Sequence, residues 1–231
     1  AINSELRQVI SGNDVVQCGY GIIWLNKYKS PILLSQSSLN IFNCLPRNNP
    51  KVQVINGIPF MGRVVLDSGA SDPLRLPYPG MELLPDTEEV EGIGGVCQSL
   101  RKTVKNEYIT EKGVELLPLS IACRDGRMSF LWLPGYDSPI FCELDESTLV
   151  KIQDAIPEDA HRLHVENNLP FVDKEFAYKI FDRLARVNET GLDAHDKLCY
   201  IEQNAITNND VDHDNTNTPR PQHTRHLSGN T

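Results

Sequence analysis

The chain contains a short stretch that constrains both its fold and its chemistry: residues 64–71, which spell Val-Val-Leu-Asp-Ser-Gly-Ala-Ser. The first three residues are apolar, which is typical of a short buried strand. Small residues follow, so the strand ends in a turn that exposes Asp67, while Gly69 allows another backbone to approach closely. An aspartate that merely begins a polar turn has the same pattern. The meaning of Asp67 therefore depends on the segments around it.

Strand and turn signals surround this stretch in a regular order. Upstream, residues 52–60 place Asn56-Gly57 between apolar residues, which is a strong hairpin signal because both residues tolerate positive φ. Downstream, residues 90–96 hold three glycines around one isoleucine, a composition that suits a mobile hairpin tip. Further strands are predicted over residues 100–109, 116–122 and 130–133.

This order resembles the retroviral-type aspartic proteases, or retropepsins, of retroviruses and LTR retrotransposons. In that family a hairpin leads to a strand ending in Leu-Asp-(Ser/Thr)-Gly-Ala, a Gly-Ile-Gly-Gly flap follows, and a later apolar strand passes beneath the catalytic loop. The corresponding segments of this chain are residues 52–60, 66–70, 92–95 and 130–133. The serine of the motif, continued as Ala70-Ser71-Asp72, is also similar to the copia-type retrotransposon proteases. The resemblance covers residues 50–145 and implies a mainly β fold, a retropepsin-like closed β-barrel with a flap hairpin.

The resemblance implies a role for each residue of the Asp-Ser-Gly-Ala loop. Asp67 is the catalytic acid, and the Ser68 hydroxyl braces the partner loop through a hydrogen bond. Gly69 and Ala70 keep the loop narrow enough for a substrate backbone. Asp72 is a candidate substrate contact, although a surface turn residue fits its position nearly as well.

The resemblance also implies that residues 92–95 form a flap over the substrate. Ile93 covers the substrate and excludes water, while Gly92, Gly94 and Gly95 supply the hinge and the tip. Loop closure of this kind completes an active site. A plain glycine-rich turn is the alternative. A phosphate-binding loop is excluded, because Lys-(Ser/Thr) does not follow the glycines at the required spacing.

The chain holds one Asp-Ser-Gly sequence, which is half of what aspartic protease chemistry needs. Two carboxylates must flank one water and share a proton, because like charges so close together cannot both ionise comfortably. Asp125 and Asp137 lack the Ser-Gly context. A working dyad therefore requires Asp67 from each of two chains across a twofold axis, which is a homodimer.

Two features of the family are missing from the chain. Retropepsins usually follow the last core strand with Gly-Arg-(Asp/Asn) at the start of a helix, and the residues after Leu133 contain no such motif. Many members also place an aspartate directly after the Asp-(Ser/Thr)-Gly-Ala loop to pair with that arginine, where this chain has Ser71. The joint absence leaves no unpaired charge. It bears on the dimer contacts and on the path of the chain's end.

Composition limits the partners of the chain. Its 231 residues include 40% hydrophobic and 23% charged residues, which is ordinary for a globular protein of one or two domains. The net charge of -9 argues against nucleic-acid or anionic-membrane binding, and no apolar run reaches the length of a membrane span. The six cysteines include no Cys-x-x-Cys pair, so neither a zinc site nor a disulfide framework is indicated. With no secretory signal, we expect reduced thiols, no cofactor, and an intracellular setting in the cytoplasm or a virus-like particle.

The chain divides into four predicted segments: residues 1–47, 48–145, 146–205 and 206–231. The first has strand patterns over residues 15–25 and 32–42, and is either an extra hairpin packed on the protease barrel or the end of an upstream polyprotein region. The second is the protease-like domain. The third is a helical extension. The fourth is a disordered tail, because its polar composition cannot offset the entropy of ordering.

Capping signals and apolar spacing predict the helices of the extension. The predicted helix starts are Asp145, Pro157 and Asp173, the last of these for residues 174–187, and a final helix is predicted over residues 192–204. His161 and His164 lie three residues apart in an expected helix. No further ligand cluster supports them, so no metal site is assigned.

Three functions are open from the sequence. The first is an aspartic endopeptidase, active as a homodimer, that cuts extended peptides within a viral or retrotransposon polyprotein of the Gag-Pol type. The second is a non-catalytic interaction module that keeps the retropepsin fold and dimerises. The third and weakest is a serine hydrolase using Ser68, which lacks the Gly-x-Ser-x-Gly elbow and a well-placed histidine base.

Overall fold

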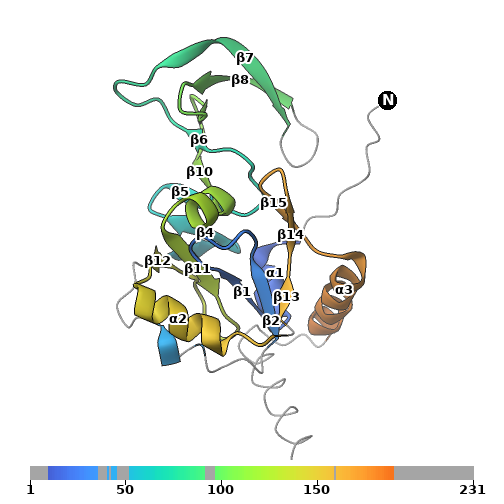
Figure 1. Ribbon diagram of the computed structural model, residues 1–231. Helices are drawn as coiled ribbons and strands as arrows, with labels where there is room; N and C mark the ends of the chain where they lie inside the picture. The colour runs from blue at the N-terminus through green and yellow to red at the C-terminus, as the bar shows by residue number, and fades with distance from the viewer. Residues whose placement is uncertain are drawn as a thin grey trace, which may run out of the picture. The chain divides into compact units, whose positions relative to one another are not determined.

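The computed structural model describes residues 10–35, 41, 43–45, 52–91, 97–158 and 160–189 (Figure 1). These residues all belong to one compact unit, residues 1–198, and the second unit, residues 199–231, lies outside the described residues. The helix predicted over residues 192–204 and the tail predicted to be disordered also lie outside the described residues. The described part of the chain is mainly β, as the sequence predicts.

Among the described residues, one antiparallel sheet has five strands in the order β12–β11–β1–β2–β13. Their bounds are Ile140–Glu143 (β12), Met128–Trp132 (β11), Tyr20–Trp24 (β1), Ile32–Ser35 (β2) and His161–Arg162 (β13). The central strand β1 pairs with β2 on one side and with β11 on the other, so Ile23 lies opposite both Ile32 and Leu131. The predicted boundary after residue 47 therefore separates strands that belong to the same sheet.

The segment before β1 is a helix where the sequence predicts a strand over residues 15–25. Helix α1 (Gly12–Gln17) begins after Ser11, whose Oγ accepts a hydrogen bond from the backbone N–H of Asp14 at 3.0 Å. Such a cap satisfies one of the free N–H groups at a helix start. Val15 and Val16 favour a strand by propensity, but both are buried against the core from the helix. Tertiary packing overrides the weak β preference of the two valines.

The described residues also form a mixed sheet of eight strands in the order β3–β4–β5–β10–β6–β9–β8–β7. Their bounds are Gln53–Ile55 (β3), Ile58–Met61 (β4), Val64–Asp67 (β5), Glu115–Pro118 (β10), Leu74–Arg75 (β6), Tyr108–Ile109 (β9), Cys97–Thr103 (β8) and Leu83–Glu91 (β7). No pairing joins the outer strands β3 and β7 within the described part of the chain, so the predicted closed β-barrel is wrong there and the sheet is open. The reason lies in the pairing of β11: its hydrogen-bonding edges are taken by β1 and β12 of the other sheet.

The hairpin predicted around Asn56-Gly57 is confirmed. β3 and β4 are antiparallel, with Ile55 opposite Ile58 and only two residues between them. Asn56 has φ 51° and Gly57 has φ 77°. Two successive residues with positive φ match the twist of a two-residue hairpin, which is why the Asn-Gly pair predicts it.

Three clusters of buried side chains form the core of the described residues. The first joins Leu66 of β5 to Phe130 and Trp132 of β11, so it packs the eight-stranded sheet against the five-stranded one. The second contains Ile23 and lies under helix α2 (Glu146–Ala155) through Ile152. Strand β5 is therefore held by side-chain packing as well as by its sheet neighbours.

The predicted caps of both C-terminal helices are confirmed. Asp145 Oδ1 accepts the backbone N–H of Thr148 at 2.9 Å at the start of α2. Asp173 Oδ1 accepts the backbone N–H of Phe176 at 2.8 Å at the start of α3 (Lys174–Glu189). Each carboxylate accepts a hydrogen bond from a free N–H and interacts favourably with the positive end of the helix dipole.

The helix predicted at Pro157 is wrong, because the described residues between α2 and α3 contain three short strands and no helix. After β13 come β14 (His164–Glu166) and β15 (Leu169–Phe171), which pair as an antiparallel hairpin. His161 therefore lies on β13 beside Leu33 of β2, and His164 lies on a separate strand. The unpaired edge of β2 is what recruits residues 161–162, and no local signal at Pro157 reveals it.

Among the described helices, none combines the length and the apolar composition that crossing a bilayer requires.

Candidate active site

Asp67 is the last residue of β5, a strand in the interior of the eight-stranded sheet. β5 pairs with β4 in an antiparallel and with β10 in a parallel arrangement, and Pro118 lies opposite Asp67. The two preceding residues anchor the strand, since Val65 is 7% exposed and Leu66 only 2%. The sequence prediction of a buried strand that ends at the acid is confirmed.

The Asp67 carboxylate is half-buried and is bound by its own loop. Its Oδ1 accepts the backbone N–H of Gly69 at 2.7 Å. Burial raises the pKa of Asp67 above its ordinary value, and the hydrogen bond from Gly69 partly opposes this. Desolvation disfavours the charged form of an acid, so this carboxyl retains its proton to a higher pH than an exposed aspartate does. A carboxyl of this kind is suited to exchanging a proton with a substrate.

Two residues that are distant in sequence, Lys102 and Asn168, contact the loop after Asp67 from two sides. Ser71 Oγ donates to Asp72 Oδ2 at 2.8 Å, and Lys102 Nζ of β8 lies 4.0 Å from Asp72 Oδ1. On the other side, Asn168 Nδ2 donates to the backbone carbonyl of Ser71 at 2.9 Å. Sequence reasoning missed both Lys102 and Asn168 as neighbours of the loop.

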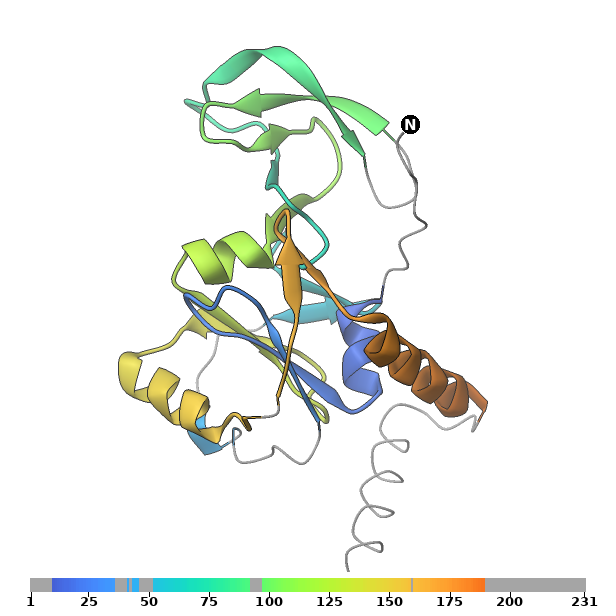
Figure 2. The ribbon, with the colours of Figure 1, turned by 45° about the vertical axis from the view of Figure 1, so that its right-hand side comes forward.

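The structure describes the predicted loop residues, but the predicted flap tip lies outside the described residues. Ser68 and Gly69 are exposed, while Ala70 and Asp72 are half-buried beside Asp67. Gly92, Ile93, Gly94 and Gly95 lie outside the described residues. The strands that lead into and out of that segment, β7 and β8, are antiparallel partners with Val90 opposite Gln98. A long hairpin at this place is thus confirmed by its two strands (Figures 1 and 2).

One face of the β7–β8 hairpin is turned toward the loop that contains Asp72. Glu88 lies opposite Leu100, so Glu88, Leu100 and Lys102 share that face of the strands. Tyr108 of β9 donates to Glu88 Oε2 at 2.6 Å, and Lys102 Nζ lies 3.5 Å from the same oxygen. The hydrogen bond from Tyr108 is the main cause that lowers the pKa of Glu88. This network joins the hairpin, β9 and the Asp72 side chain.

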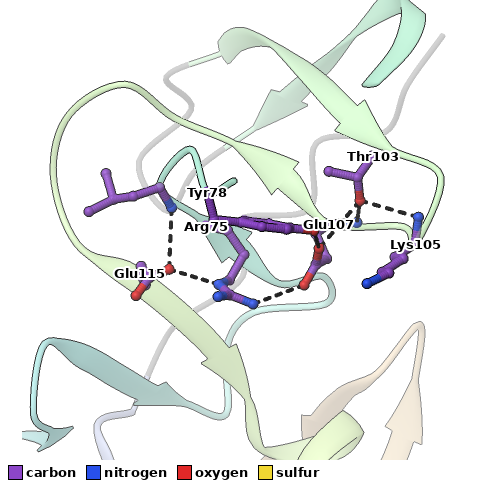
Figure 3. Close-up of polar contacts among 7 residues, drawn as sticks. Arg75, Tyr78, Thr103, Lys105, Glu107 and Glu115 are labelled. Carbon is purple, nitrogen blue, oxygen red and sulfur yellow. Dashed lines mark hydrogen bonds and ion pairs between the residues drawn. The ribbon is translucent and has the colours of Figure 1, made fainter. Parts of the chain in front are cut away.

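A second polar cluster fixes the strands at the base of the hairpin (Figure 3). Arg75 of β6 donates from Nε to Glu115 Oε1 at 2.7 Å and from Nη1 to Glu107 Oε1 at 3.0 Å. Tyr78 donates its hydroxyl to Glu107 Oε2 at 2.6 Å. Thr103, at the end of β8, donates to the same oxygen at 3.4 Å. One guanidinium therefore links β6, β10 and the β8–β9 turn, a task for which its planar fork of donors is suited.

We expect Arg75→Met to destabilise the protein at neutral pH, because it removes the ion pairs with Glu107 and Glu115. The effect should be only about 1 kcal/mol, since the Arg75 side chain is 40% exposed and solvent screens its charge. The hydrogen bond from Arg75 lowers the pKa of Glu115 below 4.5 in the folded state. A depressed folded pKa stabilises the protein above pH 4.5, and this contribution is lost as the pH falls through the folded pKa. The difference between wild type and variant in the free energy of unfolding should therefore narrow in acid.

Urea unfolding at neutral pH and in acid measures this difference. Arg127→Met is the matched control, since Arg127 is 81% exposed and its ion pair with Glu143 spans 3.7 Å. We expect no measurable loss for the control at either pH. If Arg75→Met lowers the free energy of unfolding by the same amount in acid as at neutral pH, the assigned role of Glu115 is contradicted.

The strand beside β5 differs from the one that the resemblance indicates. Residues 130–132 belong to β11 of the five-stranded sheet, and Leu133 follows that strand. Phe130 and Trp132 share a core cluster with Leu66. The neighbour in the sheet is β10 (Glu115–Pro118), and its prediction as a strand over residues 116–122 holds only to Pro118. The chain then turns into a helical segment with a π-helix, η2 (Ile121–Asp125). Residues 116–122 and 130–133 are both apolar runs of strand length, and periodicity alone does not predict which sheet each of them joins.

Metal and thiol chemistry finds no support in the described part of the chain. There, no group of three or more histidine, cysteine or acidic side chains is placed to hold a metal ion. The five described cysteines form no disulfide with one another. Burial raises the pKa of Cys18 to about 11 and that of Cys123 to about 12, so these two thiols are poor nucleophiles.

Comparison of the chain with protein-family models, with curated proteins and with solved structures finds no match.

Proposed function

We propose that this chain is an aspartic endopeptidase that acts as a homodimer. The observation that carries the proposal is Asp67 itself: an acid at the end of a buried strand, half-buried, with a raised pKa, in a loop of small residues. The Gly69 N–H fixes one carboxylate oxygen, which leaves the other for a second acid or a water. This is the arrangement that each half of an aspartic dyad needs.

The second carboxylate comes from a second copy of the chain. The sequence holds one Asp-Ser-Gly, so a symmetric dimer is the simplest way to bring two such loops together. Ser68 and Gly69 are exposed and available for contact with a partner loop. In the dimer, the neighbouring acid raises the pKa of the pair further, and the two acids titrate as one unit.

The proposed chemistry is attack of water on a peptide bond. One Asp67 takes a proton from the water, while the other donates a proton to the scissile carbonyl oxygen. The roles reverse as the amine leaves. The substrate is an extended peptide of a viral or retrotransposon Gag-Pol-type polyprotein, lying as an added strand between the active-site floor and the β7–β8 hairpin. In this proposal Gly92, Ile93, Gly94 and Gly95 close over the substrate, and Asp72 contacts it.

The test combines oligomeric state with peptide cleavage. The purified chain is incubated with a Gag-Pol-type polyprotein at mildly acidic pH, with and without pepstatin, and its mass is followed by sedimentation over a dilution series. We expect cleavage that pepstatin blocks and whose specific activity falls as the dimer dissociates on dilution. A strictly monomeric chain, or cleavage indifferent to pepstatin, would reject the proposal.

A non-catalytic dimerisation module is the second candidate. The open form of the eight-stranded sheet favours it, because the described strands do not complete the closed barrel of a retropepsin. In that case sedimentation shows a stable dimer, and no peptide is cleaved at any pH.

A further inference from the structure

The C-terminal hairpin β14–β15 touches the active-site loop at its turn. Its two-residue turn is Asn167-Asn168, and both residues have positive φ, 49° and 67°. The hairpin is also anchored in the core, since Val165 packs against the cluster that contains Leu66. Figures 1 and 2 show this hairpin in orange, with its turn directed toward the segment between β5 and β6. The same element thus packs behind the catalytic strand and reaches its loop.

The contact is a single hydrogen bond to the backbone of that loop. Asn168 Nδ2 donates to the Ser71 carbonyl at 2.9 Å, across 97 positions of sequence. Both residues are half-buried, so water competes only partly for these groups. Ser71 also donates its hydroxyl to Asp72, which ties the acceptor peptide to the residue that Lys102 approaches.

Turn geometry alone does not explain the amide at position 168. A left-handed turn position favours glycine, which has no Cβ, and tolerates asparagine, whose short polar side chain can hydrogen-bond locally. Asn167 satisfies the same backbone requirement, yet it is exposed. What separates Asn168 from Asn167 is the donor aimed at Ser71.

We propose that Asn168 is a positioning residue for the active-site loop, which makes the C-terminal hairpin a working part of the catalytic centre. Its relevance to cleavage rests on the proposed peptidase function. The amide holds the Ser71 carbonyl, and through it the path of residues 68–72, so that the Asp67 carboxylate and the Gly69 N–H keep their geometry. Loss of this donor loosens the loop without unfolding the chain.

The first test replaces Asn168 with glycine, which keeps the turn and removes the donor. Hydrogen exchange of residues 68–72, including the Gly69 amide, is compared with wild type and with Asn167→Gly. We expect exchange in the loop to rise about three- to tenfold for Asn168→Gly, the range for loss of one partly buried hydrogen bond. The Asn167→Gly control should match wild type.

The second test gives a signature that a general structural defect would not produce. Asn168→Asp keeps the size of the side chain and its tolerance of the turn, but it donates a hydrogen bond only when protonated. At neutral pH the variant should show the fast loop exchange of Asn168→Gly. As the pH falls below about 4, the ordinary range of an aspartate, the ratio to wild type should return toward one. Asn167→Asp should show a flat ratio over the same pH range.

Peptide cleavage then separates this inference from the proposed function. In an active protein, kcat of Asn168→Gly should fall about tenfold with the KM for peptide changed less than kcat, and Asn168→Asp should recover in acid. If wild type cleaves nothing while the exchange signature appears, the loop contact stands and the peptidase proposal fails. If exchange of residues 68–72 is unchanged in Asn168→Gly, Asn168 does not position the loop, whatever the activity.

Discussion

Replacing Asp67 with asparagine is expected to lower kcat/KM for peptide cleavage by about 10³-fold or more. Asparagine has nearly the shape of aspartate and can still accept the Gly69 N–H seen at 2.7 Å. It can neither take a proton from water nor hold one for the carbonyl oxygen. Because the proposed dimer is symmetric, one substitution in the sequence removes both acids at once. The measurement is steady-state cleavage of a peptide substrate at mildly acidic pH.

A subunit-mixing experiment makes the same prediction sharper. When wild type and Asp67→Asn are mixed in equal amounts and allowed to exchange partners, about a quarter of the dimers contain two wild-type chains. Activity should fall to about that fraction if each centre needs both acids. An enzyme in which each chain works alone would retain about half of its activity.

Asp137→Asn is the matched control. Asp137 also precedes a serine, but it is exposed and lies outside the Asp67 loop. Its substitution should leave kcat/KM unchanged. Cleavage that survives Asp67→Asn at the wild-type rate would remove Asp67 as the catalyst.

Replacing Ile23 with alanine should destabilise the protein by about 3 kcal/mol. Ile23 is fully buried at the centre of the five-stranded sheet and belongs to the second core cluster. Its truncation loses the transfer free energy of the removed carbons and leaves a cavity between Ile32 and Leu131. Urea unfolding measures the loss as a lower midpoint at an unchanged slope.

Ile55→Ala is the matched control, since Ile55 lies on strand β3 and is 51% exposed. The control should lie within about 0.5 kcal/mol of wild type. A small effect for Ile23→Ala would contradict the place of Ile23 in the shared core, and would fit the sequence interpretation of residues 1–47 as the end of an upstream polyprotein region. A large effect, accompanied by loss of peptide cleavage at temperatures where the variant unfolds, would show that β1 and β2 are part of the proposed catalytic domain.

Local signals were sufficient for the Asn56-Gly57 turn and for the starts of α2 and α3. Asn56-Gly57 predicts its hairpin because both residues take positive φ without strain. Asp145 and Asp173 predict the starts of α2 and α3 because a carboxylate placed before a helix satisfies its free N–H groups. Asp67 was found in the same way, as a polar residue at the end of an apolar run.

The local sequence could not predict which secondary structure several segments adopt, or which segments they pack and pair with. Residues 15–17 join a helix, residues 119–125 leave the strand for a helical turn, and residues 161–166 form strands. In each case the deciding contact is distant: the core under α1, the pairing of β10 with β5, and the open edge of β2. The contact of the Asn168 amide could not be predicted locally either, since its acceptor lies 97 positions away in the sequence.

Local signals thus indicated the turn at Asn56-Gly57, the starts of two helices and the acid that stands at the end of a buried strand. Tertiary structure alone decided which strands lie side by side, that the larger sheet is open over the described residues, and which side chains reach the loop of Asp67. The physical reason is that backbone preferences act over a few residues. Hydrogen bonds between strands, and burial of apolar area, depend on surfaces that exist only after the chain has folded.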